Sequence, residues 1–242
     1  MQRLLVAAGA MMAMNVAAQE VSILSAGAVE PGLRAALALY DKKTKVTFNT
    51  APQIRERVEK KGEKYDVVVV PPAVMDSFAE AGRVEPDRVM LGRVGQGLAV
   101  RPGVPVPDVS TVEAMKRTLL EAESVVFNRA TGGQYIESML RNLGVYERIE
   151  RKVTRYASAA QVMDHLLAGQ GYEIGFAPIT EIMLYQGKGL RFVGPLPAEV
   201  QQLNAYVASP MSGGSNADLA ATFVRFLGGP AAKTAFRAAG IE

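Results

Sequence analysis

Short apolar strands alternate with amphipathic helices along most of the chain, and this alternation limits the folds that it can adopt. The clearest strand is at residues 66–70, where four consecutive valines give the continuous β-branched run typical of a strand buried on both faces. Helices follow such strands, with apolar residues at helical spacing, as at positions 33, 36, 37 and 40. Repeated strand–helix units predict an α/β fold with mostly parallel sheets flanked by helices.

The alternation continues along the rest of the chain. Strands are predicted at residues 21–24, 45–48, 66–70, 95–100, 124–127, 152–155, 173–176, 190–193 and 203–208. Helices are predicted to begin near residues 33, 54, 74, 110, 131, 158, 215 and 230. Three of these starts match the capping-box pattern, a Ser or Thr followed three residues later by Glu or Gln: residues 110–113, 131–134 and 158–161.

Two stretches rich in Pro and Gly, residues 101–107 and 194–197, divide this pattern. They predict two lobes joined by two crossing strands. Residues 19–100 and 205–242 would form a discontinuous first lobe, and residues 101–204 the second. Ligands of α/β folds bind at the carboxyl ends of strands, and small molecules commonly bind between two lobes. We therefore expect a ligand cleft between the lobes.

Residues 1–18 have the composition of a targeting segment. Arg3 gives a positive start, residues 4–14 are apolar and uncharged, and residues 16–18 supply the small side chains that a signal peptidase requires. The apolar run is too short for a membrane anchor, which needs about 20 residues to cross a bilayer core. We predict a signal peptide that is cleaved after Ala18 and a mature protein in the periplasm.

The scarcity of reactive side chains excludes most enzyme chemistry. With no cysteine and 1 histidine, the chain lacks thiol nucleophiles, disulfides, thiolate metal sites and most histidine-dependent sites. Its net charge of +3 is too small for a nucleic-acid-binding surface. These exclusions predict a binding protein rather than an enzyme, with no cofactor, no metal and no nucleic-acid partner.

Three strand-to-helix turns carry small residues at the start of a helix. Small residues let a ligand approach the backbone N–H groups, and the helix dipole favours a negative charge there. If the turns converge, they form a backbone cradle for an anion; taken singly, each is also consistent with an ordinary capped helix. The candidate ligand-binding residues in these turns are Gly27, Ala28, Thr131, Gly132, Gly133, Ser158 and Ala159.

The paired glycines at positions 132 and 133 add a further constraint. Each glycine in a first helical turn destabilises the helix by about 1 kcal/mol relative to alanine. Some other interaction must compensate, and we expect the close approach of either a ligand or another segment of backbone.

Charged residues near these turns leave alternatives open. Arg129 is either a bidentate partner for a ligand carboxylate or a solvated loop residue. His165 is interpreted as a packing or surface residue, and Asp66 as a turn cap. An exported enzyme that used carboxylates would need a close acidic pair. The sequence offers no obvious pair, and the acids to place are Asp66, Asp76 and Glu181.

The order of these segments resembles the type II periplasmic solute-binding proteins, specifically their molybdate-binding branch. The resemblance rests on the first strand and loop at residues 21–29, the loop and helix start at 128–135, and the runs at 158–176 and 192–199. It covers nearly all of the predicted mature chain. It implies a monomeric, two-lobed protein that hands a small anion to the permease of an ABC importer. A ligand-sensing module for a membrane receptor would have the same fold and stays an alternative.

The resemblance also implies ligand-binding positions. The family's serine in the first loop corresponds to Ala28, and its second loop corresponds to Thr50 and Ala51, where Thr50 keeps a hydroxyl. Amide donors of the later loops correspond to Gly132 or Gly133 and to Ala159. With hydroxyl donors missing and Arg129 where the family often has proline, a small organic carboxylate fits at least as well as molybdate or tungstate.

Overall fold

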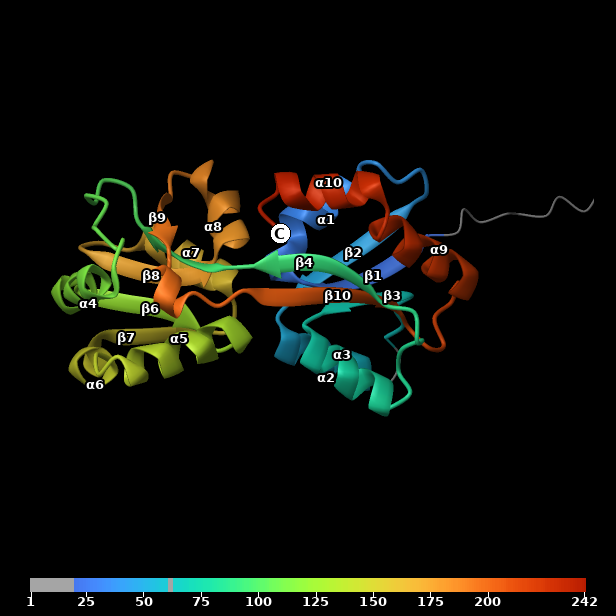
Figure 1. Ribbon diagram of the computed structural model, residues 1–242, viewed down its shortest axis with the longest axis horizontal. Helices are drawn as coiled ribbons and strands as arrows, with labels where there is room; N and C mark the ends of the chain where they lie inside the picture. The colour runs from blue at the N-terminus through green and yellow to red at the C-terminus, as the bar shows by residue number, and fades with distance from the viewer. Residues whose placement is uncertain (1–19, 61–62) are drawn as a thin grey trace, which may run out of the picture.

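Residues 20–60 and 63–242 are described by a computed structural model, in which two α/β lobes lie side by side (Figure 1). The predicted signal peptide, residues 1–18, and its cleavage site after Ala18 lie outside the described residues. Within the described residues, no helix is both long enough and apolar enough to cross a membrane.

Each lobe is built on one five-stranded sheet with helices packed on it. The strands of the first lobe are β1 (Val21–Ala26), β2 (Thr44–Asn49), β3 (Val67–Val70), β4 (Val89–Val94) and β10 (Asn204–Pro210). Its helices are η1 (Gly27–Val29, a 3-10 helix), α1 (Glu30–Leu37), α2 (Ala51–Glu59), α3 (Pro72–Glu80), α9 (Ala217–Leu227) and α10 (Pro230–Ala238).

The second lobe has the same general plan. Its strands are β5 (Gln96–Val100), β6 (Ser124–Asn128), β7 (Val153–Tyr156), β8 (Glu173–Pro178) and β9 (Arg191–Pro195). Its α-helices are α4 (Val112–Glu121), α5 (Thr131–Asn142), α6 (Tyr146–Ile149), α7 (Ala159–Ala168) and α8 (Ile179–Gln186). Two 3-10 helices complete it, η2 (Glu150–Lys152) and η3 (Ala198–Val200).

Both sheets combine parallel and antiparallel pairing. The strand order is β2-β1-β3-β10-β4 in the first sheet and β7-β6-β8-β5-β9 in the second. In each sheet the first three strands are parallel, and the other two are joined to them by antiparallel pairs. The predicted two-lobed α/β fold is confirmed, but the sheets are mixed rather than mostly parallel, because β10 and β5 each pair antiparallel with both of their neighbours. Each parallel strand is followed by a helix, and the strand-to-helix turns of one sheet lie at the same edge, because the carboxyl ends of its parallel strands lie there.

The chain crosses between the lobes twice, from β4 to β5 through Gly95 and again between β9 and β10. β5 therefore pairs with β8 and β9 in the second sheet, so the predicted boundary after residue 100 falls one strand too late. The Pro/Gly-rich residues 101–107 are a loop inside the second lobe. The sequence did not reveal β4, because Gly92 interrupts its apolar pattern; a Cβ there would lie 2.7 Å from the Glu242 carbonyl oxygen.

Apolar side chains fill both lobes. The four valines of β3 are each 0% exposed, which confirms a strand buried on both faces. In the second lobe, one apolar cluster includes Phe127 and Leu140, and a second includes Met163 and Leu166. Burying each such side chain contributes about 1.5–3 kcal/mol, so the sheets are rigid supports for the turns at their carboxyl ends.

Candidate functional site

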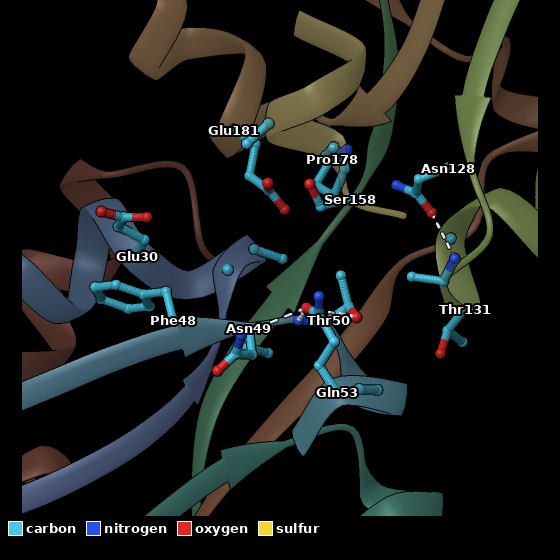
Figure 2. A pocket seen from close by; sticks show the side chains of 18 of the residues that line it. Glu30, Phe48, Asn49, Thr50, Gln53, Asn128, Thr131, Ser158, Pro178 and Glu181 are labelled. Atoms are coloured by element: carbon cyan, nitrogen blue, oxygen red, sulfur yellow. Dashed lines mark hydrogen bonds between the residues drawn. The ribbon is translucent and has the colours of Figure 1, made fainter. Parts of the chain in front are cut away.

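A cleft of about 340 Å³ lies between the lobes, where β1, β2, β6, β7 and β8 end and helices begin (Figure 2). Eight of the ten predicted ligand-binding residues line it: Gly27, Ala28, Thr50, Ala51, Thr131, Gly132, Ser158 and Ala159. Of the other two, Arg129 is exposed and Gly133 is buried, and both lie outside the lining. The structure therefore brings the three small-residue turns together, with two more helix starts beside them.

The helix start at Thr50 is closed by its own side chains. Gln53 Oε1 accepts hydrogen bonds from Thr50 N at 2.9 Å and from Thr50 Oγ1 at 3.0 Å, which is one half of a capping box. The Thr50 hydroxyl proton is therefore already engaged within the protein. Pro52 has no N–H group and the Thr50 side chain accepts the N–H of Gln53, so the first turn of α2 offers the cleft the N–H of Ala51.

The start of α5 is organised by Asn128 rather than by a capping box. Asn128 Oδ1 accepts a hydrogen bond of 2.8 Å from Ala130 N, and its amide nitrogen points into the cleft (Figure 2). The residue before the helix is Ala130, which has no capping side chain, so the capping box predicted at residues 131–134 is wrong. Asn128 thus supplies a side-chain donor that the sequence analysis did not include.

The paired glycines of α5 are explained by contacts within the protein. A Cβ on Gly133 would lie 1.8 Å from the Asn128 carbonyl oxygen, and a Cβ on Gly132 would lie 3.0 Å from Gln96 Nε2. The expected close approach is therefore to backbone at Gly133 and to the buried Gln96 side chain at Gly132.

The start of α7 is capped as predicted by Ser158. Ser158 Oγ accepts a hydrogen bond of 3.3 Å from Gln161 N, and Gln161 Oε1 accepts one of 3.0 Å from Ala157 N. Because Ser158 acts as an acceptor toward the helix, its hydroxyl proton is available to a ligand. His165 contacts Glu173 at 3.0 Å and Tyr156 at 2.8 Å, and none of these three residues lines the cleft.

The fifth helix start, that of α8, brings Glu181 into the cleft. Its half-buried side chain points into the space between the lobes (Figure 2). Burial, and to a smaller extent the charge of Glu30, raises the pKa of Glu181 from 4.5 to about 7. The neighbouring Thr180 hydroxyl donates a hydrogen bond of 2.6 Å to the Ala28 carbonyl oxygen, so α8 is tied to the first lobe.

Two further polar side chains, those of Glu30 and Tyr206, line the cleft. Glu30 accepts a hydrogen bond of 2.7 Å from Arg34 Nε, which forms a salt bridge with it. Tyr206 reaches the cleft from β10, and burial together with the charge of Glu181 raises its pKa. Among the described residues, no Lys, Arg or His lines the cleft, and no cluster of three or more potential metal ligands exists.

The other acidic candidates lie elsewhere. Asp66 accepts hydrogen bonds from Ser22 N at 2.8 Å and from Asn216 N at 3.1 Å, so it anchors backbone as the predicted turn cap would. Asp76 pairs with Arg88 at 2.6 Å and is outside the lining. Of these three acids, Glu181 alone lines the cleft.

Sequence reasoning missed Asn128 and Tyr206 as cleft residues and mentioned Glu181 only as one of three acids to place. One signal for Glu181 is its place three residues after the end of β8, where a helix start holds an acidic side chain. A comparable signal for Asn128 is its position as the last residue of a buried strand. Tyr206 carries no local signal, because β10 joins the site only through the sheet.

Comparisons with known proteins agree with this architecture. An aconitate isomerase from Pseudomonas sp is 27% identical over 235 residues, covering 92% of this chain and 87% of that protein. The periplasmic molybdate-binding protein of Azotobacter vinelandii superposes with a TM-score of 0.73 at 15% identity, covering 92% of this chain and 98% of that one. A sulfate-binding protein from Mycobacterium tuberculosis H37Rv also gives 0.73 at 15% identity, with 92% and 86% covered.

At such low identity these structures establish the fold alone, and it is the two-lobed fold that the resemblance implies. The family assignment comes from a sequence model described as bacterial extracellular solute-binding protein, which matches residues 21–242 and so includes both lobes and every residue that lines the cleft. The chain belongs to the family of bacterial extracellular solute-binding proteins.

Proposed function

We propose that this protein captures a small anion between its lobes and delivers it to the permease of an ABC importer. The observation that carries the proposal is the convergence of five helix starts from both lobes on one cleft. Each start presents at least one unpaired N–H group and the positive end of a helix dipole. Asn128 and Ser158 add neutral donors. Such a set binds an anion without a basic side chain.

The volume and the family support a small solute and an extracellular site. About 340 Å³ is near the lower end of small-molecule pockets, which suits an inorganic oxyanion or a short organic carboxylate. Export through residues 1–18, with cleavage after Ala18, would place the monomeric protein in the periplasm, where it meets an importer.

A thermal-shift panel tests the proposal. It contains molybdate, tungstate, sulfate, phosphate, and mono-, di- and tricarboxylates that include both isomers of aconitate. A ligand at about 100 times its dissociation constant stabilises the folded state by about 2.7 kcal/mol, which raises the Tm by about 5–10 °C. No shift with any anion at any pH between 5 and 8.5 would contradict the proposal.

A matched pair of variants locates the site. Ala160→Asp places a negative charge at the second position of α7, inside the cleft, where the helix dipole tolerates an acid. Ala231→Asp places the same charge at the second position of α10, outside the lining. We expect the first variant to lose the ligand-induced shift and the second to keep it, while both fold.

Isomerisation of a small unsaturated carboxylate is a second candidate function. It is favoured by Glu181, a cleft carboxyl group whose pKa of about 7 suits it to accept and return a proton near neutral pH. The relative of 27% identity is named as an aconitate isomerase. Proton NMR of cis-aconitate incubated with the protein would show the trans isomer growing, and Glu181→Gln would abolish it. A flat time course would leave binding as the function.

A further inference from the structure

Two carboxyl groups line the cleft, but only one of them is paired. Glu30 is held by Arg34, whereas Glu181 forms no salt bridge with any residue in the ranges 20–60 and 63–242. The Glu181 carboxyl group lies over Gly27, since a Cβ built there would be 3.5 Å from both of its oxygens. It therefore occupies the start of η1, one of the places where a bound anion is expected.

Burial and the charge of Glu30 favour the neutral form of Glu181, and no basic group among the described residues that line the cleft opposes them. The titratable groups around it are few. They are Glu30 on α1, Tyr206 on β10, Tyr185 on α8 itself and, beyond Tyr185, Asp164 on α7. None of them is basic. Burial raises the pKa of both tyrosines, and the charge of Glu181 contributes in each case, so both phenols stay protonated near neutral pH.

We propose that the cleft takes up one proton together with its anionic ligand, and that Glu181 holds this proton as a hydrogen-bond donor to the ligand. An anion that entered beside an ionised Glu181 would add a second negative charge within hydrogen-bonding range, in a site lined by no basic side chain of the described residues. Protonation converts the carboxylate from a repelling group into a donor. Protein, anion and one proton from the solvent form the complex: one O–H bond forms on the Glu181 carboxylate, and no other covalent bond changes.

Tyr206 provides a second neutral donor to the same ligand. Its ring is buried and its side chain lines the cleft, and no described residue forms a hydrogen bond with its hydroxyl. The proposal rests on anion capture as the function of the cleft. It adds that the affinity for the anion falls as the pH rises above the pKa of Glu181.

Calorimetry of the full mature chain tests the proposal, with trans-aconitate and molybdate as separate probes. Titrations at pH 6.5, 7.5 and 8.5, each in two buffers of different ionisation enthalpy, give both the affinity and the protons bound. Most carboxylic acids ionise near pH 4, so the carboxylate probe changes little in this range. We expect close to one proton bound per anion at pH 8.5 and an affinity about tenfold lower there than at pH 7.5.

Three variants assign the effect. Glu181→Gln, a neutral mimic of the protonated acid, should bind the probe with no proton uptake and with nearly the same affinity at all three pH values. Glu30→Gln should keep the proton uptake, because Glu181 still holds the proton, and should move the fall in affinity to a slightly lower pH, because the charge of Glu30 is the smaller cause of the raised pKa of Glu181. Tyr206→Phe should lower the affinity about tenfold at each pH without removing the proton uptake.

The outcomes separate this inference from the proposed function. If neither these probes nor any other anion of the panel binds at any pH, anion capture is wrong and this inference falls with it. If a probe binds without proton uptake, the inference alone is overturned. It is also overturned if the Glu181→Gln variant retains the original pH dependence. Circular dichroism of each variant checks folding, and the proton count for the unmodified protein needs no variant.

Discussion

The carboxyl group of Glu181 in one lobe lies against Gly27 in the other, with 3.5 Å between its atoms and the position of a Cβ on Gly27. The two residues are more than 150 positions apart in the chain, yet they face each other from the two lobes and both line the cleft. Gly27 has a negative φ, so the backbone itself accepts a larger residue. The backbone conformation at this turn therefore does not require glycine, and the missing side chain instead leaves space in the cleft.

Gly27→Ala should weaken anion binding while leaving folding intact. The added methyl group would stand in van der Waals contact with the Glu181 carboxyl and cover the N–H groups that begin η1. We expect at least a tenfold loss of affinity by calorimetry and a change in unfolding free energy within about 0.5 kcal/mol. Gly187→Ala, where nothing lies within 4 Å, is the matched control and should bind normally.

Gly133→Ala should destabilise the second lobe strongly. Its Cβ would overlap the Asn128 carbonyl oxygen, so the start of α5 must move away from β6. We expect a loss of about 3 kcal/mol or more in urea unfolding. Gly132→Ala meets only the Gln96 side chain and should lose less than half as much. Equal losses in the two variants would contradict this explanation of the glycine pair.

The stability of the protein should fall as the pH rises from about 4.5 to about 7, because of Glu181. Its pKa is about 7 in the folded state and near 4.5 in the unfolded state, so the folded state binds more protons between these values. The difference in unfolding free energy is up to about 3 kcal/mol, absent below the lower pKa and complete above the higher one. Subtracting the curve for Glu181→Gln from that for the original protein isolates this effect; parallel curves would contradict it.

Thr180→Val should loosen the contact between α8 and the first lobe. The buried hydrogen bond from Thr180 Oγ1 to the Ala28 carbonyl oxygen is lost, and the carbonyl is left without its partner. We expect a loss of about 1–3 kcal/mol in urea unfolding and a larger radius of gyration by small-angle scattering. Thr180→Ser keeps the hydroxyl and should preserve the radius.

Arg129→Ala distinguishes the two interpretations of this exposed residue. Because Arg129 lies outside the cleft lining, we expect affinities for carboxylates within about twofold of the original. A loss of tenfold or more, equivalent to a charge-assisted hydrogen bond of about 1.5–3 kcal/mol, would show that the arginine reaches the ligand. Arg129→Lys is the control, since it keeps the charge but not the bidentate geometry.

Local patterns predicted the elements that support the cleft. The valines of β3 identified a doubly buried strand, and Ser158 identified the start of α7, because both signals depend on neighbours in the sequence. A helix after Thr50 was predicted without its capping box, although Gln53 three residues later is a local signal for one. The three small-residue turns converged as expected: the turns after β6 and β7 lie at one edge of the second sheet, and the turn after β1 in the first sheet lines the same cleft.

The parts that were not predicted depend on contacts between distant segments. α8 has no apolar stripe, since Ile182 is buried while Met183 and Leu184 are exposed, so its periodicity is weak. The role of Glu181 arises only when α8 packs against η1. The sequence indicated that some close contact compensates for the helix-destabilising Gly133. It could not show that this contact is with the Asn128 carbonyl group, because every residue has the same backbone.

The second sheet and its helices form one unbroken stretch of chain between the two crossings, whereas the first lobe is made of two separate pieces. One face of the cleft, with Asn128, Ser158 and Glu181, is thus encoded as a cassette. Exchange of this cassette between relatives would transplant half of the recognition chemistry in a single recombination event. The residues of one wall can then change to bind a new solute, while the hydrogen-bond donors of the opposite wall stay the same.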